Sequence, residues 1–574
     1  MAAYDIIHIE KRALSPHNKK ELHMPTLKLK AISSLEKCFY NDDIDALCEK
    51  KDFIIFKNER LTFQVAFLNT TVDRFINQCP VVIKGDLAKY TTVRQVTNVP
   101  VAYPAPFVRS EGEYIKKEPG LYPDLIRPLM YDGAITVPYN NLGAIWVEVD
   151  PKNMLDAGEY TLKIALNTRS GEELAATEVN IRIINATLPE QELIHTEWFY
   201  TDCIAQHYHV RAFSEKHWKL IESFMRCATK NGVNMILTPV FTPELDTYIG
   251  GERLTTQLVD ITVLSKDKYG FSFEKLHRWI DLALDCGYKY FEIPHFFTQW
   301  GSKHAPKFVA KVNGKTKRIF GWETNAQGEE YEIFLSQFIP ALISEFKARG
   351  LDKKCFFHVS DEPHMADLEQ YTACKNILKK YLDGYTIIDA LSDFEFYKSG
   401  ALEKPVPHTK DITPFIEAGV PGLWAYYCAS GAPVADRFIA MPTARTRILG
   451  VQLYLYNIEG YLHWGYNYYN NKHSYDVVDP YGTTDGGFWV PAGDTFLVYP
   501  GSDGKPWESL RLNALREAVD DIRALRAYEA KFGRAATEDL IYEGVEGRVL
   551  DFTNYPTNPA YLISLRERIA RALA

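Results

Sequence analysis

The sequence predicts a multi-domain protein, with an N-terminal β-sandwich followed by a (β/α)8 barrel of the TIM type and a short C-terminal helical extension. The chain has 574 residues, which is too long for one ordinary hydrophobic core. Short strand-like segments separated by turns fill its first part, whereas strand-like runs alternate with helical patterns after about residue 190. We therefore expect the sandwich at 1–190, the barrel at 191–533 and an extension at 534–574 that packs on the barrel.

The expected sandwich rests on short alternating segments that are bounded by turn residues. Gly85-Asp86 and Gly171-Glu172 indicate two of the turns. Regular short strands of this kind are typical of two packed antiparallel sheets. Since the region shows neither an acid pair nor a His cluster, we expect it to be structural or to flank the substrate. The predicted strands are 52–56, 61–67, 81–83, 145–149, 160–166 and 177–184.

The expected barrel begins with a strand at 193–199 and a helix at 214–230. Ser214 suits the N-cap of that helix, and Asn231-Gly232 suits its end. The next elements are a strand at 234–241, a helix at 273–286, a strand at 290–297, a helix at 330–348, a strand at 355–359, a helix at 365–381 and a strand at 386–391. Further strands are expected near 405–412, 422–427 and 460–464, and a last long helix at 507–531. Eight such units fit a (β/α)8 barrel with insertions, and a doubly wound open sheet is the alternative.

The composition excludes several classes of function. The net charge is −9 without a basic block, which argues against nucleic-acid and anionic-membrane partners. No apolar run is long enough to cross a bilayer, and residues 1–18 lack the pattern of a secretory signal. The nine cysteines are scattered, as is typical of reduced thiols in a cytoplasmic protein. We expect a small oligosaccharide or glycoside as substrate, no cofactor, and an oligomer as one option.

Two adjacent acids, Asp361 and Glu362, come directly after the predicted strand at 355–359. In a barrel, the carboxyl ends of the strands form the active site. Paired carboxylates are the usual equipment for cleaving a glycosidic bond, so this motif indicates a glycoside hydrolase. The alternative is a helix start, because Ser360 or Asp361 could be an N-cap and Pro363 suits a first turn.

Other polar and aromatic residues follow the predicted barrel strands and are expected at the same depth. Aromatic rings stack on sugar faces, and Asn, His and acids bind hydroxyl groups. Each aromatic residue could equally be core packing. The candidates are His195, Trp198, Asn234, Thr238, His295, Trp300, His358, Asp389, Asp393, Trp424, Tyr426, Tyr427, His463, Trp464, Tyr466 and Asn467.

The adjacency of Asp361 and Glu362 constrains the mechanism. Neighbouring side chains on a strand point in opposite directions, whereas the nucleophile and acid of a retaining enzyme lie about 5 Å apart across one bond. Adjacent acids suit substrate-assisted catalysis better. In that mechanism the 2-acetamido oxygen attacks the anomeric carbon, one acid orients the acetamido nitrogen, and the other protonates the glycosidic oxygen.

Several longer segments resemble glycoside hydrolase family 123 and the related domain of unknown function 4091. They are Ser360-Asp361-Glu362-Pro363, 461–468 with Trp464-Gly465-Tyr466-Asn467, Asp479-Pro480-Tyr481, 491–501 with Pro491-Ala492-Gly493-Asp494, the helix from Ser509 to Glu517, Tyr122-Pro123-Asp124, Ile145-Trp146-Val147 and Ala157-Gly158-Glu159-Tyr160. The resemblance implies a β-N-acetylgalactosaminidase-like enzyme with substrate assistance. It implies that Asp361 orients the acetamido group and that Glu362 is the acid/base.

Further roles and three competing functions stay open. Trp464 could stack on the sugar, Tyr426 or Tyr427 could bind the acetamido oxygen, and Asn467 and Asp494 could contact hydroxyls or brace loops. A metal-dependent hydrolase would use His358, Asp361 and His364, with His207, His209 and His295 nearby, although we expect no metal. A non-catalytic sugar-binding protein is the second competitor. The third is a glycosidase for a sugar without the acetamido group, in which Asp393 or Asp389 would serve.

Overall fold

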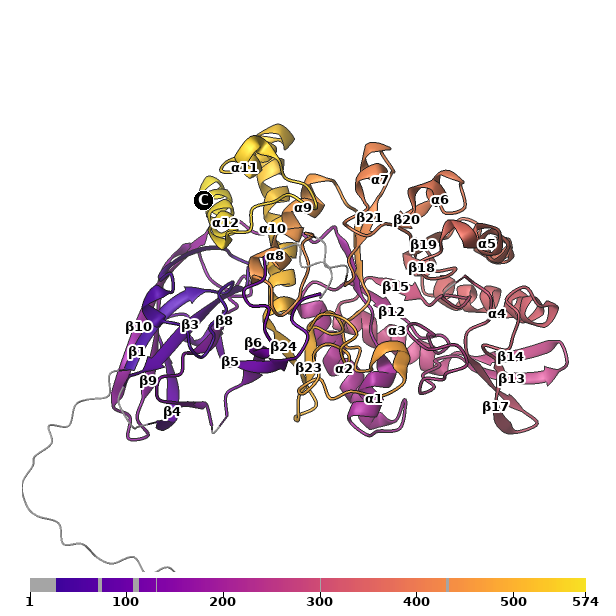
Figure 1. The fold of residues 1–574 in the computed structure, drawn as a ribbon, viewed down its shortest axis with the longest axis horizontal. Coiled ribbons are helices and arrows are strands. Elements are labelled where there is room, and N and C mark those ends of the chain that lie inside the picture. The colour runs from indigo at the N-terminus through magenta and orange to yellow at the C-terminus, as the bar shows by residue number, and fades with distance from the viewer. Residues whose placement is uncertain (1–26, 71–74, 107–112, 131, 300, 430–432) are drawn as a thin grey trace, which may run out of the picture.

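The computed structural model describes residues 27–70, 75–106, 113–130, 132–299, 301–429 and 433–574. Figure 1 shows a strand-rich N-terminal region on one side and, on the other, a region of parallel strands with helices around them. The long helix α10 (Leu510–Phe532) contacts strand β6 of the first region and helices α8 and α9 of the second. The two regions therefore meet along a helix from near the end of the chain.

The N-terminal region holds two sheets that share an apolar core. One has the strand order β1-β3-β8-β5-β6-β24-β23, and the other has the order β2-β10-β9-β4-β7. Phe53 and Ile181 from the second sheet join Val65 and Val147 from the first in this core. The strands are β1 (Leu27–Ser33), β2 (Asp52–Phe56), β3 (Leu61–Asn69), β4 (Ile76–Lys84), β5 (Thr91–Val101), β6 (Gly120–Pro128), β7 (Ala134–Val137), β8 (Gly143–Val149), β9 (Gly158–Asn167), β10 (Glu173–Ile184), β23 (Val498–Pro500) and β24 (Pro506–Ser509).

The six segments predicted here are all strands, but β1, β5, β6 and β7 were not predicted. Strand β6 illustrates the reason, because Pro123 lies inside it and reads as a strand breaker. The register between β5 and β6 shifts between Thr97 and Asn98, and Asn98 is paired with Pro123. This irregularity accommodates a residue that cannot donate to the ladder.

Strands β23 and β24 belong to the N-terminal sheet although they follow the barrel in the sequence. Ser509 and Glu508 pair with Leu125 and Ile126 of β6. The helix predicted at 507–531 therefore starts later, at Leu510, with Ser509 as its N-cap. Since strand pairing crosses the expected boundaries, the domain division at 190 and 533 stays a prediction.

Eight parallel strands form a nearly closed barrel. The strand order is β20-β19-β18-β15-β12-β11-β22-β21. The two ends of this order, β20 and β21, meet at an isolated bridge between His408 and Tyr426. The strands are β11 (Ile194–Glu197), β12 (Met235–Leu237), β15 (Tyr290–Ile293), β18 (Cys355–Phe357), β19 (Thr386–Ala390), β20 (Lys404–Val406), β21 (Trp424–Tyr426) and β22 (Gly460–His463). The helices between them include α1 (Thr201–His207), α2 (Glu215–Lys230), α3 (Glu274–Cys286), α4 (Glu329–Ala348), α5 (Leu368–Leu382), α6 (Phe394–Lys398), α7 (Thr413–Glu417), α8 (Thr443–Arg447) and α9 (Leu449–Leu455). The doubly wound alternative is wrong, because the strand order runs around the barrel in chain order.

A small four-stranded sheet at one side of the barrel was not predicted. Two hairpins in the loops after β12 and β15 build it, in the order β14-β13-β16-β17 (Figure 1). Its strands are β13 (Asp260–Ser265), β14 (Lys268–Ser272), β16 (Phe308–Val312) and β17 (Lys315–Phe320). The turn at Asn313-Gly314, with φ of 50° and 78°, is a strong hairpin signal that the sequence does contain.

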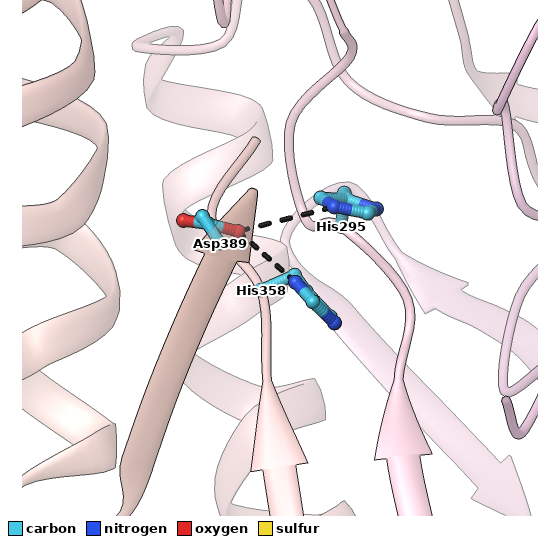
Figure 2. Close-up of side chains that lie close together, drawn as sticks. All are labelled: His295, His358 and Asp389. Atoms are coloured by element: carbon cyan, nitrogen blue, oxygen red, sulfur yellow. Dashed lines mark hydrogen bonds and ion pairs between the residues drawn. The ribbon is translucent and has the colours of Figure 1, made fainter. Parts of the chain in front are cut away.

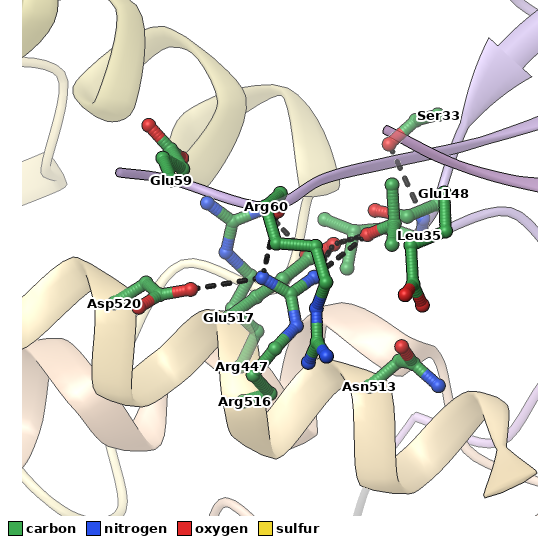
Figure 3. A network of polar contacts seen from close by, with 12 residues as sticks. Ser33, Leu35, Glu59, Arg60, Glu148, Arg447, Asn513, Arg516, Glu517 and Asp520 are labelled. Atoms are coloured by element: carbon green, nitrogen blue, oxygen red, sulfur yellow. Dashed lines mark hydrogen bonds and ion pairs between the residues drawn. The ribbon is translucent and has the colours of Figure 1, made fainter. Parts of the chain in front are cut away.

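A buried ionic network joins the N-terminal sheets to α10 and α8 (Figure 3). Glu517 on α10 accepts hydrogen bonds from Thr62 Oγ1 at 2.6 Å and Arg447 Nη1 at 2.8 Å. Arg516 bonds to the backbone oxygen of Arg60 at 2.9 Å. The helices α11 (Arg534–Tyr542) and α12 (Pro559–Leu573) then pack beside α10.

Within the described ranges, none of the helices combines the length and apolar character that a membrane span requires. All nine cysteines lie among the described residues, and each is unpaired.

Candidate active site

The adjacent acids Asp361 and Glu362 lie in the loop that follows β18. Asp361 is half-buried, whereas Glu362 is exposed and has a left-handed backbone with φ of 43°. This conformation is uncommon for a residue with a long side chain and costs about 1–3 kcal/mol, so the surroundings must impose it. The acids do not start a helix, because the next turn, η4 (Met365–Asp367), has His364 as its N-cap.

A pocket of about 420 Å³ lies at these acids, at the carboxyl ends of the barrel strands. Its volume is within the range of about 300–1,000 Å³ that is typical of small-molecule sites. Five predicted site residues line it, namely Asp361, Glu362, Trp198, Tyr426 and Trp464. Asp494, expected either to contact hydroxyls or to brace a loop, lines it too. The remaining lining residues are Asp246, Ala390, Cys428, Ala429, Leu462, Lys472, Trp489 and Val490.

The hydroxyl group of Tyr426 donates a hydrogen bond to Oε1 of Glu362. Tyr426 ends strand β21, so the barrel itself positions this phenol. Burial and the nearby Glu362 raise the pKa of Tyr426 well above its usual value, and the phenol stays neutral. It therefore orients the Glu362 carboxyl as a fixed donor.

Two indole rings in the pocket wall are held by hydrogen bonds through their nitrogens. Trp464 Nε1 donates to Asp494 Oδ2 at 3.1 Å, and Trp198 Nε1 donates to Glu292 Oε1 at 2.7 Å. Trp489 lies beside Trp464, with ring centroids 5.3 Å apart. Because their nitrogens are bonded, these rings can offer apolar surface to a sugar without leaving a buried donor unpaired.

Beneath the acids, His358 lies between two buried carboxylates (Figure 2 shows Asp389 with His358 and His295). Its Nε2 is 2.7 Å from Glu292 Oε1, and its Nδ1 is 3.1 Å from Asp389 Oδ1. Burial opposes the charged form of His358, but the two hydrogen bonds outweigh burial and raise its pKa to about 9. His358 is therefore an imidazolium that donates from both nitrogens.

His295 lies against His358 with ring centroids 4.2 Å apart and the rings tilted by 34°, and its environment keeps it neutral. Burial, followed by the charge of His358, lowers the pKa of His295 well below its usual value. His295, His358 and Asp389 are close enough together to hold a metal ion. However, both nitrogens of His358 already donate to carboxylates, so a metal would have to displace its proton. This group differs from the one that the metal-hydrolase alternative expected around Asp361 and His364.

Burial raises the pKa of Asp361 well above its usual value, and the charges of Glu362 and Asp246 act in the same direction. The cation at His358 opposes this shift. Burial and the neighbouring acids therefore favour the protonated form of Asp361, whereas a positive charge nearby favours its ionised form.

A second buried network fixes Asp494. His463 Nε2 lies 3.3 Å from Asp494 Oδ1, while His463 Nδ1 accepts from the backbone N–H of Gly465 at 3.0 Å. Nε2 therefore carries the proton that Asp494 accepts. Arg437 Nη1 bonds to Glu197 Oε2 at 2.7 Å. Burial alone would raise the pKa of Glu197, but Arg437 and the neighbouring histidines lower it to about 2.

Several predicted substrate-binding residues do not line the pocket, because they make buried contacts elsewhere. Asn234 makes hydrogen bonds to the backbone of His195 and Leu193. Asn467 accepts from the backbone N–H of Tyr200 and donates to its carbonyl oxygen. Tyr466 donates to the backbone oxygen of Phe224. The members of this group are His195, Asn234, His295, His358, Trp424, Tyr427, His463, Tyr466 and Asn467.

Asp393 and Asp389 were the carboxylates expected for a sugar without the acetamido group, and neither lines the pocket. Asp393 is the N-cap of α6 and accepts from the backbone of Glu395 and Phe396. Asp389 is fully buried and accepts a hydrogen bond from Tyr371 at 2.6 Å. Trp300 lies outside the described residues.

The charged and indole-bearing lining residues that the sequence analysis missed come from long loops. Asp246 follows β12, and Lys472 and Trp489 follow β22. The sequence around these residues shows no periodic pattern, so it did not predict that they lie at the site. The rule that barrel sites are built by the loops after the strands could have drawn attention to them.

Comparisons with known proteins identify one enzyme family. The model "Glycoside hydrolase 123, catalytic domain" matches residues 198–528. A solved family 123 glycoside hydrolase from Clostridium perfringens, described in work on glycolipid glycan hydrolysis, superposes with a TM-score of 0.71 at 15% identity over 96% of this chain and 98% of that one. At this identity the likeness shows the fold alone.

Other solved structures are less similar. An endo-β-1,4-mannanase from Thermotoga petrophila has a TM-score of 0.32 at 12% identity, covering 59% of this chain and 78% of that one. A β-glucuronidase from Parabacteroides merdae has a TM-score of 0.29 at 11% identity, covering 88% and 53%. These scores are too low to carry an argument. The search of curated proteins finds no match.

Proposed function

Because the chain belongs to glycoside hydrolase family 123, which supports glycosidase activity, we propose that it removes a terminal β-linked N-acetylhexosamine by substrate-assisted retaining catalysis. N-acetylgalactosamine is the favoured sugar, in line with the family resemblance. We read the architecture accordingly as a β-sandwich followed by a (β/α)8 catalytic barrel. The observation that carries the proposal is the pair Asp361 and Glu362, adjacent in the chain and in one pocket.

In the first step, Glu362 donates a proton to the glycosidic oxygen while the 2-acetamido oxygen of the substrate attacks the anomeric carbon. The bond to the leaving group breaks, and an oxazolinium ion forms. Asp361 accepts the acetamido N–H and stabilises the positive charge that develops there. This charge favours the ionised form of Asp361, which offsets the pKa rise that its neighbours impose.

In the second step, Glu362 takes a proton from a water molecule, which attacks the anomeric carbon and opens the oxazoline. The two inversions retain the β configuration, and Glu362 regains its proton. Tyr426 holds Glu362 by its hydrogen bond in both steps. Trp464 and Trp198 provide apolar surface for the sugar ring.

Substrate assistance is supported further by the state of the other carboxylates in the pocket region. Both oxygens of Asp494 accept hydrogen bonds, from His463 and Trp464. Asp389 lies below the pocket in the His358 network. A double displacement would need a second carboxylate free to attack. Besides Asp361, which is adjacent to Glu362 in the chain, only Asp246 is free among the lining acids that the structure describes.

The proposal is tested with aryl β-N-acetylgalactosaminide, β-N-acetylglucosaminide and β-galactoside, each with and without a chelator. We expect chelator-resistant cleavage of an acetamido sugar and none of the galactoside. Equal cleavage of the galactoside would contradict substrate assistance. Loss of activity with chelator, restored by zinc, would favour the metal-dependent alternative at His295, His358 and Asp389.

A further inference from the structure

Asp246 lines the pocket, and its carboxylate is unpaired there. Among the described residues, no donor lies within hydrogen-bond or ion-pair distance of its side-chain oxygens. Of the other acids of the pocket, Glu362 accepts from Tyr426, and Asp494 accepts from Trp464 and His463. Asp246 is thus a carboxylate with free acceptor sites that faces the space a ligand would occupy.

The backbone of Asp246 is held firmly although its side chain is free. Its N–H donates to Gln299 Oε1 at 2.9 Å. Its carbonyl oxygen accepts from Ser474 Oγ at 2.8 Å and Tyr468 OH at 3.3 Å. Asp246 also has a left-handed backbone with φ of 49°. These contacts tie the loop after β12 to the loop after β22, so the carboxylate is presented at a fixed place before any ligand arrives.

The surroundings of Asp246 make an unpaired anion unfavourable in the empty pocket. Burial, and then the charges of Glu362 and Asp494, raise the pKa of Asp246 to about 7 against the opposing influence of Arg253. Arg253 does not satisfy it, because its guanidinium pairs with both oxygens of Asp202 at 2.8 and 2.9 Å. Lys472, the one lysine that lines the pocket, makes no ion pair with Asp246 in the described part of the chain. A ligand that brings hydrogen-bond donors would supply the missing partner.

We propose that Asp246 binds the sugar by accepting hydrogen bonds from hydroxyl groups remote from the scissile bond, and that it thereby selects among neutral sugars. The assignment rests on the proposed function, because Asp361 and Glu362 would take the acetamido group and the glycosidic oxygen. The hydroxyls left for Asp246 are those at C3, C4 and C6. A site built to bond a hydroxyl discriminates strongly against an analogue that lacks it, because the buried acceptor is then left unpaired.

The test uses the full chain and the substitutions Asp246→Asn and Asp246→Ala. Asp267→Asn is the matched control, because Asp267 is an exposed acid in the turn between β13 and β14. Steady-state rates are measured with the aryl N-acetylhexosaminide that the wild type cleaves, and with its 3-deoxy, 4-deoxy and 6-deoxy analogues. Binding of the free parent and deoxy sugars is measured by titration calorimetry.

We expect Asp246→Ala to lower kcat/KM by about 10- to 100-fold for the parent sugar, as for a lost hydrogen bond to a charged group. Asp246→Asn should lose less, because its amide oxygen can still accept, and the control should match the wild type. At least one deoxy analogue should be poor for the wild type but no worse than the parent for Asp246→Ala. That loss of discrimination is the decisive signature.

Three outcomes would overturn the assignment. Equal losses for the parent and every deoxy analogue, together with a lower melting temperature, would indicate a structural role. Complete inactivity of Asp246→Ala that azide restores would make Asp246 a nucleophile. A wild-type protein that binds none of the sugars would also refute it. If the wild type binds sugars but cleaves none, the proposed function fails, and the same comparison of deoxy sugars by calorimetry still decides the role of Asp246.

Discussion

His358 Nε2 lies 2.7 Å from Glu292 Oε1, and both side chains are fully buried below the pocket. Glu292 in turn accepts from Trp198 Nε1, whose indole lines the pocket. The charged pair therefore connects the acid loop at Asp361 with an aromatic wall of the site. This connection is the basis of the first prediction.

Replacing His358 with Gln should lower kcat while changing KM less, since His358 contacts no substrate and acts through Asp361. The expected loss is about 10- to 100-fold, as for an electrostatic contribution of one positioned group. If only proton delivery were affected, the loss in kcat at high pH should be larger for substrates with poor leaving groups than for activated substrates. Equal losses for both leaving groups would instead agree with a role in stabilising the oxazolinium through Asp361.

The same substitution predicts a pH dependence of stability. The pKa of His358 is raised from about 6.5 in the unfolded chain to about 9 in the folded one, so its stabilisation is fully present below about pH 6.5 and is lost as the pH rises through about 9. The melting temperature of the wild type should therefore approach that of His358→Gln between pH 7 and 10. A constant difference over this range, measured by differential scanning calorimetry, would contradict an imidazolium at this position.

Glu362→Gln should lower kcat by about 10²- to 10⁴-fold for glycosides with poor leaving groups, because the glutamine cannot donate the proton. Aryl glycosides with good leaving groups need less protonation, so their first step should be affected less. The measurement is a plot of log kcat/KM against leaving-group pKa, which should become steeper in the variant. Tyr426→Phe should fall between the variant and the wild type, and parallel plots would argue against an acid role for Glu362.

Asp361→Asn should lose about 10²- to 10³-fold in kcat, since the carboxylate that stabilises the acetamido nitrogen is gone. Azide should not restore the rate, because the nucleophile belongs to the substrate. The products are checked by chromatography for a glycosyl azide. Its appearance would point to a missing carboxylate nucleophile or base of the enzyme and would refute substrate assistance.

Glu517→Ala should destabilise the protein without altering KM. Its removal leaves Arg447 without one partner (Figure 3). It also removes the hydrogen bond from Thr62, which joins the N-terminal sheet to α10. Breaking a buried ion pair costs about 3–5 kcal/mol. Urea unfolding measures this loss. The control Glu546→Ala, at an exposed position, should stay within about 0.5 kcal/mol of the wild type.

The strand and helix pattern of the barrel was predictable because apolar periodicity is a local property. The strand at 290–297 contains β15 (Tyr290–Ile293), and the helix at 273–286 matches α3 (Glu274–Cys286), which ends at Gly287 with φ of 103°. The strands that carry little local signal were missed. Strand β6 contains Pro123, and β24 is short and pairs with a strand hundreds of residues away.

The residues that line the pocket were predictable only in part, because the local pattern shows where a strand ends but not where each side chain points. Asp361, Glu362, Trp198, Tyr426 and Trp464 lie at or just after the ends of barrel strands that the sequence indicates, and all five line the pocket. His463 and Asn467 also follow a strand, but their side chains turn into the core to satisfy other polar groups. The direction of a side chain at a strand end depends on its neighbours, which local pattern does not contain.

The sequence by itself determined the acid pair, the family resemblance and most of the strand order, because these depend on residue types and on spacing along the chain. Tertiary structure alone decided that Asp246 enters the pocket, that His358 is charged between Glu292 and Asp389, and that β23 and β24 complete the N-terminal sheet. Each of these features depends on groups far apart in the sequence. Burial and proximity in space, which set the pKa values and the hydrogen-bond partners, exist only after the chain has folded.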